Sequence, residues 1–211
     1  MKLYADPITV NCRKVIAGFK LMDIPYERVH VDYFKAEQKS EEYLKINPNS
    51  ALPALVDGDF VLWESNSLLQ YAADKHGKSA YYPTDLQTRA DINRWLLWEA
   101  SAWFSSCYVY LVENCVKPVL DAEPDQSVLD GEADNFHKLA GILDERLSQS
   151  EWITGSNPTI ADVVCAAPMH LHWWQKLPLD PHPNLKRWMT QKVEALPAWK
   201  ASHVGEGFTL A

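Results

Sequence analysis

The sequence lacks long hydrophobic runs and any concentration of positive charge. No apolar run in its 211 residues approaches the ~20 residues that a membrane-spanning helix needs. Its 20 Lys and Arg stand against 28 Asp and Glu, for a net charge of −8, which disfavours nucleic acids and anionic membranes as partners. The first residues, MKLYADP, contain no apolar signal core. We therefore expect a cytoplasmic protein.

Cysteines and metal ligands are also sparse. His170 and His172 are two residues apart, so they do not share a helix face, and no Cys or carboxylate stands at ligand spacing from them. We expect no metal. The spacing of the four cysteines fits neither a zinc site nor a disulfide framework, so in a reducing cytosol we expect free thiols. These cysteines are Cys12, Cys107, Cys115 and Cys165.

The first part of the chain mixes strand and helix patterns. Val15, Ile16 and Phe19 recur at helical spacing, and Asp57-Gly58-Asp59 is typical of a hairpin turn. The element order is β-α-β-α-β-β-α. We expect strands at 2–5, 26–31, 54–56 and 60–62, and helices at 11–21, 40–46 and 65–76.

The pattern changes after residues 79–85, which we interpret as a linker. No further strand is predicted, and Phe136, Leu139, Leu143 and Leu147 follow the spacing of one helix face. We expect helices at 86–116, at 128–148, from Thr159 onward and at 184–195. The predicted fold class is therefore α/β plus all-α, with domains at 1–78 and 85–211.

Two features of residues 46–65 point to a binding site. Pro53 stands at the first residue of a strand, where its missing N–H is tolerated. A cis Leu52–Pro53 bond would turn the backbone of Leu52 outward to hold an extended peptide. Glu64 and Ser65 open the next helix, whose free N–H groups favour a carboxylate. They suit an amino-acid head group, although a plain helix start capped by Ser65 is the alternative.

Two longer segments carry a resemblance to a known family. NPNSALPALVDGDFVLWES (47–65) resembles the glutathione-binding half of a cytosolic glutathione transferase. WITGSNPTIADVV (152–164) is similar to the capping-box segment of that family, with Thr159 as N-cap and Asp162 reaching back. The resemblance covers essentially the whole chain. It implies a thioredoxin-like glutathione-binding domain, an α-helical bundle domain and a homodimer that acts in detoxification.

The resemblance also implies roles in holding glutathione. The backbone of Leu52 would pair with the cysteinyl unit, and Glu64 and Ser65 would hold the γ-glutamyl head. Gln38, or Lys39 beside it, would contact the glycyl carboxylate. Ala51 stands where several classes have Lys or Gln, so one familiar contact is missing. The implied glutathione-binding residues are Gln38, Lys39, Leu52, Pro53, Glu64 and Ser65.

The loop at residues 9–12 is where the thiol of glutathione would be activated. Thr9 stands where a dithiol oxidoreductase would have its first cysteine, which argues against dithiol chemistry. Lowering the pKa of a free thiol by two units takes roughly 2.7 kcal/mol. One hydrogen bond to a charged acceptor supplies about 1.5–3 kcal/mol, and a helix end adds up to ~1 kcal/mol.

Three residues of this loop are catalytic candidates. By resemblance, Thr9 stands where theta- and phi-like enzymes place a serine, and its extra methyl group would favour Asn11 if it misplaces the hydroxyl. Nu-like bacterial enzymes use Thr and Asn near this position, and beta-like enzymes use a cysteine, here Cys12. We rank Thr9 first, then Asn11, then Cys12, and leave the class open.

The second substrate would lie between the domains, against the first long helix. Candidates are Trp103, Phe104, Cys107 and Tyr108, of which one faces the electrophile and the others are core or dimer surface. We favour Trp103, although such aromatic stripes are more often core than ligand site.

Three functions compete. The favoured one is conjugation of the glutathione thiolate to an apolar electrophile, and this would survive loss of Cys12. A glutathione-dependent disulfide or peroxide reductase would instead depend on Cys12 or Asn11. A non-catalytic binding module on the same fold is the third, but the intact Pro53 and Glu64-Ser65 argue against it.

Overall fold

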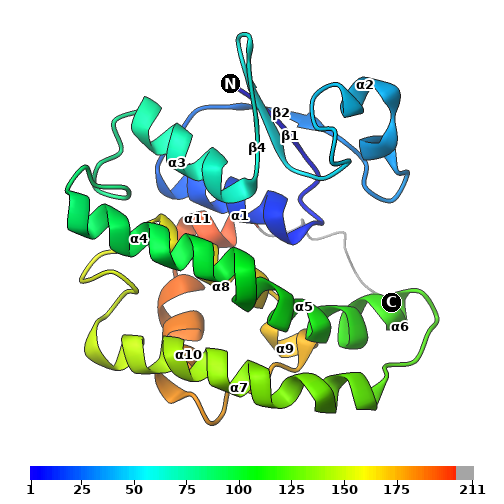
Figure 1. Cartoon of the computed structure of the whole chain (residues 1–211), viewed down its shortest axis with the longest axis vertical. Coiled ribbons are helices and arrows are strands. Elements are labelled where there is room, and N and C mark those ends of the chain that lie inside the picture. The colour runs from blue at the N-terminus through cyan, green and yellow to red at the C-terminus, as the bar shows by residue number, and fades with distance from the viewer. Residues whose placement is uncertain (203–211) are drawn as a thin grey trace. The chain divides into compact units, whose positions relative to one another are not determined.

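The computed structural model describes residues 1–202, and these form two compact units (Figure 1). The first contains Met1–Pro83 together with the segment that begins at Leu196, and the second contains Thr84–Ala195. The second domain was predicted to run from residue 85 to 211. The segment after Leu196 instead groups with the first unit, and residues 203–211 lie outside the described residues.

The first unit is built on a four-stranded mixed sheet, as a thioredoxin-like fold requires. Its strand order is β2-β1-β3-β4, with β1 and β2 parallel and the other pairs antiparallel. β1 alternates between the two faces and buries Leu3 and Ala5 completely. All four strands were predicted. They are β1 (Lys2–Ala5), β2 (Glu27–His30), β3 (Ala54–Asp57) and β4 (Phe60–Trp63).

Two helices, α1 (Val10–Leu21) and α3 (Ser65–Lys75), pack against each other in this unit (Figure 1). Gly18 permits the close approach, because a Cβ there would come within 2.3 Å of the Leu69 side chain. α3 ends before Gly77, which has φ +63° in the left-handed region that favours glycine. Both helices were predicted to within one residue at each end.

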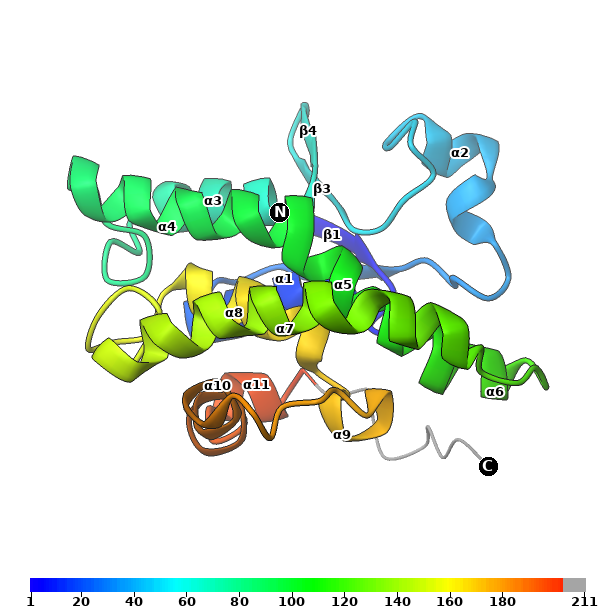
Figure 2. The ribbon, with the colours of Figure 1, turned by 60° about the horizontal axis from the view of Figure 1, so that its bottom comes forward.

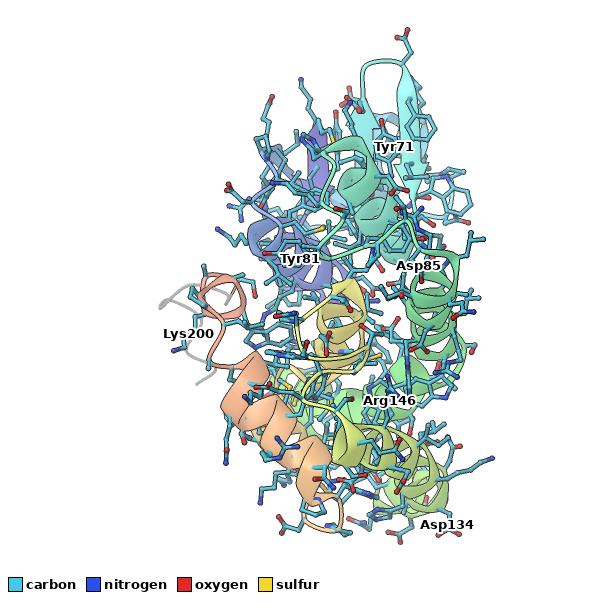
Figure 3. All side chains as sticks on the ribbon, turned by 90° about the vertical axis from the view of Figure 1, so that its left-hand side faces the viewer. Tyr71, Tyr81, Asp85, Asp134, Arg146 and Lys200 are labelled. Carbon is cyan, nitrogen blue, oxygen red and sulfur yellow. The ribbon has the colours of Figure 1, made fainter. Side chains whose placement is uncertain are left out.

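The connection from β2 to β3 carries only short helical pieces. These are the 3₁₀ turn η1 (Glu37–Lys39) and α2 (Glu41–Leu44), whose N-cap Ser40 accepts a hydrogen bond from the amide of Tyr43 at 3.2 Å. The β3–β4 hairpin is tied to α3 by Tyr71, whose hydroxyl donates to Asp57 at 2.6 Å (Figure 3). The hairpin is therefore held in place against the helix that begins just after it.

The ordered elements of the second unit are helices over its described residues, apart from an isolated bridge between Trp152 and Gly155. Its first helical run has two π-helical turns and ends at Val119, three residues after the predicted end at residue 116. In order, the run contains α4 (Leu86–Trp98), η2 (Glu99–Trp103), α5 (Phe104–Leu111), η3 (Val112–Val116) and α6 (Lys117–Val119).

The long helix α7 (Gln126–Gln149) packs against α5 (Figures 1 and 2). Its predicted apolar face is confirmed, because Phe136, Leu139, Leu143 and Leu147 are all buried. Arg146 (Figure 3) links α7 to α4 through an ion pair with Asp91 at 3.6 Å.

The predicted capping box at the start of α8 (Ile160–Ala166) is present. The buried carboxylate of Asp162 accepts from the amide of Thr159 at 2.8 Å and from its hydroxyl at 3.2 Å. Its other oxygen accepts from the amide of Ile153 at 2.8 Å and from the indole of Trp188 at 3.3 Å. Asp162 therefore joins three segments of the second unit in a structural role.

The last part of the chain differs most from the sequence-based expectation. The helix predicted at 184–195 consists of α10 (Pro183–Arg187) and a π-helical stretch, η5 (Trp188–Val193). Three pieces were not predicted: η4 (Ala167–Met169), α9 (His172–Gln175) and α11 (Pro197–Lys200). Over residues 1–202, no helix combines the length and apolar character needed to cross a membrane.

Packing on α1 explains why α11 groups with the first unit. The guanidinium of Arg13 lies over the ring of Trp199, 5.3 Å from its centroid, and its Nε donates to Ser202 at 3.4 Å. Trp199 is 1% exposed. A four-residue helix this far along the chain has too little periodicity to reveal its packing partner from sequence.

Candidate functional site

The register of the sheet brings the predicted binding elements to one edge. Tyr4 of β1 pairs with Ala54 of β3, and Ala54 pairs with Trp63 of β4. Continuing that register by one residue puts Pro53 beside the end of β1 on one side and beside Glu64 on the other. The loop after β1, the Leu52–Pro53 bond and the start of α3 are therefore neighbours.

Asp6 shapes the loop that leads from β1 into α1. One carboxylate oxygen of Asp6 accepts from the amide of Ile8 at 3.1 Å, and the other accepts from the amide of Tyr33 at 2.9 Å. Its backbone carbonyl accepts from the amide of Thr9 at 3.1 Å. These bonds fix the backbone that carries the three catalytic candidates.

Thr9 is the N-cap of α1. Its hydroxyl accepts from the amide of Cys12 at 3.4 Å and donates to the carbonyl of Asp6 at 3.2 Å. A hydroxyl has only one proton to donate. The proton of Thr9 is thus used within the loop, and the residue acts as a helix cap in this structure.

Cys12 is completely buried in the first turn of α1. Burial raises the pKa of its thiol to about 12, although the hydrogen bond from Thr9 opposes the effect. Because the thiolate is the reactive form of cysteine, this environment argues against Cys12 as a nucleophile or redox group.

Asn11 and Ser65 meet between α1 and α3. The Ser65 hydroxyl donates to the Asn11 side-chain oxygen at 3.4 Å. The NH₂ group of the Asn11 side chain lies opposite this oxygen and can donate two hydrogen bonds. The structure therefore brings together a predicted catalytic residue and a predicted glutathione-binding residue.

Lys14 joins the same cluster and was missed by the sequence analysis. Its ammonium donates to the Ser65 hydroxyl oxygen at 3.2 Å and to the Asn66 side-chain oxygen at 3.2 Å. Lys14 is only 2% exposed, although lysine is almost never fully buried unless it is paired. The available signal was a lysine placed one helical turn after Val10 and just before the buried Val15.

The Leu52–Pro53 peptide bond is cis. The Ala51 carbonyl just before it accepts from the Tyr43 hydroxyl at 2.7 Å and from the side-chain NH₂ group of Asn47 at 2.8 Å. Within residues 1–202, neither the N–H nor the C=O of Leu52 makes a hydrogen bond. A fixed backbone with an unused donor and acceptor can pair with an extended peptide.

Gln38 lies in η1 and is 5% exposed. Its backbone carbonyl accepts from the Ser50 hydroxyl at 3.0 Å, which ties it to the loop before Pro53. The side-chain oxygen is buried and has no hydrogen-bond partner in the described part of the chain. The Gln38 amide thus has capacity for another partner, whereas Lys39 is exposed to solvent.

Glu64 has a strained backbone at the start of α3. Its φ of 75° and ψ of 107° lie in a region that non-glycine residues rarely adopt. Ser65 follows as the first residue of the eleven-residue helix and is 7% exposed. The first N–H groups of a helix have no partner inside it, which suits an anionic group.

The electrophile candidates occupy different environments in the second unit. Trp103 is completely buried, and its indole donates to the carbonyl of Cys165 at 2.9 Å. It packs as a core residue against Trp98. Phe104 is half-buried and Tyr108 is 42% exposed, with their rings stacked at 5.4 Å. The preference for Trp103 over its neighbours therefore has no support from its position.

The histidines considered as metal ligands have other partners. His170 contacts the carbonyl of Ala167 at 3.0 Å, and His172 lies 3.1 Å from a carboxylate oxygen of Glu194. No group of three or more possible ligands from His, Cys, Asp and Glu was found between residues 1 and 202. The four cysteines are free and buried.

The fold is thioredoxin-like, and the residues predicted to hold a peptide gather at one edge of its sheet beside the N-terminus of α3. Comparison with known families agrees. The family model of the glutathione S-transferase N-terminal domain matches residues 3–80, and that of the C-terminal domain matches residues 100–197.

Individual relatives span nearly the whole chain. Human glutathione S-transferase theta-1 is 33% identical over 92% of this chain and 82% of its own length. Glutathione S-transferase GstB of Escherichia coli is 27% identical over 88% and 89%. A structure of glutathione S-transferase-I bound with lactoylglutathione has a TM-score of 0.85 at 26% identity, covering 95% and 97%. The chain belongs to the glutathione S-transferase family.

Proposed function

We propose that this protein is a glutathione transferase that joins the sulfur of glutathione to an apolar electrophile, with Asn11 holding the thiolate. The observation that carries the proposal is the convergence of three features at one edge of the sheet. These are the backbone of Leu52, unpaired within residues 1–202, beside a cis proline, the Glu64-Ser65 start of α3, and the loop of Asn11.

Glutathione is held along this edge by its backbone and its charged ends. Leu52 pairs with the cysteinyl unit in the manner of an added strand. Ser65 and the N-terminus of α3 receive the γ-glutamyl carboxylate, and Glu64 accepts from the ammonium. Gln38, assisted by Lys39, contacts the glycyl carboxylate at the other end.

Asn11 is better placed than Thr9 to donate a hydrogen bond to the sulfur of glutathione, because the donor hydrogens of the two side chains point in different directions. The Thr9 hydroxyl donates to the Asp6 carbonyl at 3.2 Å, so it must turn before it can serve a ligand. The Asn11 amide uses its oxygen toward Ser65 and keeps its NH₂ group for an acceptor. A hydrogen bond to a charged acceptor is worth about 1.5–3 kcal/mol. One such bond therefore supplies most of the roughly 2.7 kcal/mol that lowering the pKa of the glutathione thiol by two units requires.

The electrophile is an apolar molecule that contacts aromatic side chains of α5. Phe104 and Tyr108 are the candidates, because Trp103 is fully buried. A stacked aromatic pair with partial exposure offers a flat apolar surface to an organic substrate. This chemistry suits a cytoplasmic detoxification enzyme, and the resemblance favours a homodimer.

The experiment measures binding and turnover in one preparation. Glutathione is titrated into the protein by calorimetry, and conjugation is followed with a panel of aryl halide, epoxide and organic isothiocyanate electrophiles. We expect binding and turnover of at least one electrophile. Binding without conjugation, but with reduction of glutathionyl disulfides or peroxides, would favour the redox alternative. Absence of binding would contradict the proposal.

A further inference from the structure

Lys14 is a buried cation with no part in the proposed chemistry so far. It lies in the second turn of α1, 2% exposed, and its ammonium reaches across to the first turn of α3. Taking an ammonium out of water is costly unless other groups compensate. A plain packing role would be served as well by an apolar side chain of similar length.

The direction of the hydrogen bonds around Lys14 is unambiguous. An ammonium only donates, so the Ser65 oxygen accepts from it at 3.2 Å and cannot give its own proton in that direction. That proton goes to the Asn11 oxygen at 3.4 Å, a long and weak bond. Lys14 thus sets which way the Ser65 hydroxyl points and leaves its proton easy to redirect.

We propose that Lys14 is a positioning residue for the γ-glutamyl carboxylate: its ammonium orients the Ser65 hydroxyl toward that group and supplies a buried counter-charge. The inference rests on the proposed glutathione site and names a residue within it that neither the sequence analysis nor the family resemblance assigns. When the carboxylate arrives, Ser65 exchanges its bond to Asn11 for a shorter, charge-assisted one. The Lys14–Ser65 bond remains and strengthens it.

Two consequences separate this role from packing. The effect of Lys14 must depend on the carboxylate of the ligand, because that is the group it serves. It must also depend on positive charge rather than on side-chain volume, so Arg can replace Lys14 in part, whereas the uncharged Met, of similar length, cannot.

The test combines a change in the protein with a change in the ligand. Calorimetry measures the affinity of wild type and Lys14→Met for glutathione and for 4-aminobutyryl-cysteinyl-glycine, which lacks only the γ-glutamyl α-carboxylate. We expect Lys14→Met to weaken glutathione binding by about 10- to 100-fold, and to leave binding of the truncated ligand within about 2-fold. Lys20→Met, at an exposed position of the same helix, is the matched control and should change neither.

The outcomes distinguish this inference from the function it rests on. If wild type does not bind glutathione, the proposed function fails. If wild type binds but Lys14→Met weakens both ligands equally, or neither, then Lys14 has only a packing role. Lys14→Arg provides a second measurement should Lys14→Met not fold. Arg should preserve most of the preference for glutathione over the truncated ligand, and loss of that preference in a folded Lys14→Arg would overturn the inference.

Discussion

At the scale of single residues, the proposed site depends on which side-chain donors are already engaged in hydrogen bonds within the protein. Thr9 and Asn11 are two residues apart in one loop, and sequence alone favoured Thr9. The structure shows that the Thr9 proton is donated to the Asp6 carbonyl, while Asn11 presents its amide oxygen to Ser65. The Thr9 contact lies within the loop, but the partner of Asn11 is Ser65, which is distant in sequence. No pattern within the loop could have revealed the Asn11–Ser65 contact.

Cys12 provides a prediction at this scale. Burial raises the pKa of its thiol to about 12, so at pH 7 it is present as the unreactive thiol. Cys12→Ala should leave the conjugation rate within about 3-fold of wild type, and should lower the free energy of unfolding by about 1 kcal/mol through a small cavity. Steady-state kinetics and urea unfolding measure the two effects. A loss of activity in a folded variant would return Cys12 to the mechanism.

Glu64 combines a strained backbone with a proposed binding role. Its backbone at φ 75° costs on the order of 1–3 kcal/mol for a residue with a Cβ. Glu64→Gly should raise the free energy of unfolding by up to about 1 kcal/mol, while glutathione binding weakens through loss of the carboxylate that accepts from the ligand ammonium. Glu64→Ala is the control, since it loses the carboxylate but keeps the strain. The idea fails if both variants are equally destabilised.

At the scale of elements, regular patterns were predictable and irregular ones were not. The alternation of β1, the hairpin turn at Gly58 and the apolar face of α7 are periodic over several residues, so sequence located them. The π-helical turns within residues 86–119 insert extra residues without changing the apolar character of the run. Lys14 was missed because residue type suggests exposure, whereas a partner on another helix allows its burial.

Asp162, at the start of α8, is expected to make the stability of the protein depend on pH. Burial raises the pKa of Asp162 from 3.8 to about 6, against the opposing effect of its four hydrogen bonds. Between these values the folded state holds a proton that the unfolded state has released. The stability contributed by Asp162 therefore falls as pH rises through this window, by about 3 kcal/mol in total.

The variant Asp162→Asn isolates this contribution, because asparagine does not titrate. Its deficit in the free energy of unfolding relative to wild type should be largest near pH 4.5 and should shrink as pH rises to 7. Urea unfolding of both proteins across this range measures the difference. A deficit that grows with pH would mean that the carboxylate is more acidic in the folded state than in the unfolded one.

At the scale of the whole molecule, the two units differ in how far sequence could describe them. The first contains short strands joined by turns with clear residue preferences, and its proposed site lies at one edge of one sheet. The second consists mainly of helices over its described residues, and burial decides which of its aromatics can meet a substrate. The sequence favoured Trp103 over Phe104 and Tyr108, yet Trp103 is 0% exposed and Tyr108 is 42% exposed.

The exposed edge strand β4 supports the proposed homodimer. Phe60, Val61 and Trp63 are 47%, 41% and 40% exposed there, and an apolar sheet edge is a surface that a partner can cover. Sedimentation should give twice the chain mass of 24.0 kDa. Phe60→Asp should shift the protein toward the monomer, while Leu86→Asp, at another exposed apolar position, should not. A wild-type monomer would contradict the dimer.

The most direct test of the central claim is the ionisation of the bound thiol. Ultraviolet thiolate absorbance is followed across pH for the glutathione complexes of wild type, Thr9→Ala and Asn11→Ala. We predict an apparent thiol pKa about two units below the free value near 8.5 in wild type and Thr9→Ala, and a return toward the free value in Asn11→Ala. A wild-type complex that binds glutathione but ionises it at the free pKa would contradict the account. A shift abolished by Thr9→Ala alone would assign the thiolate to Thr9.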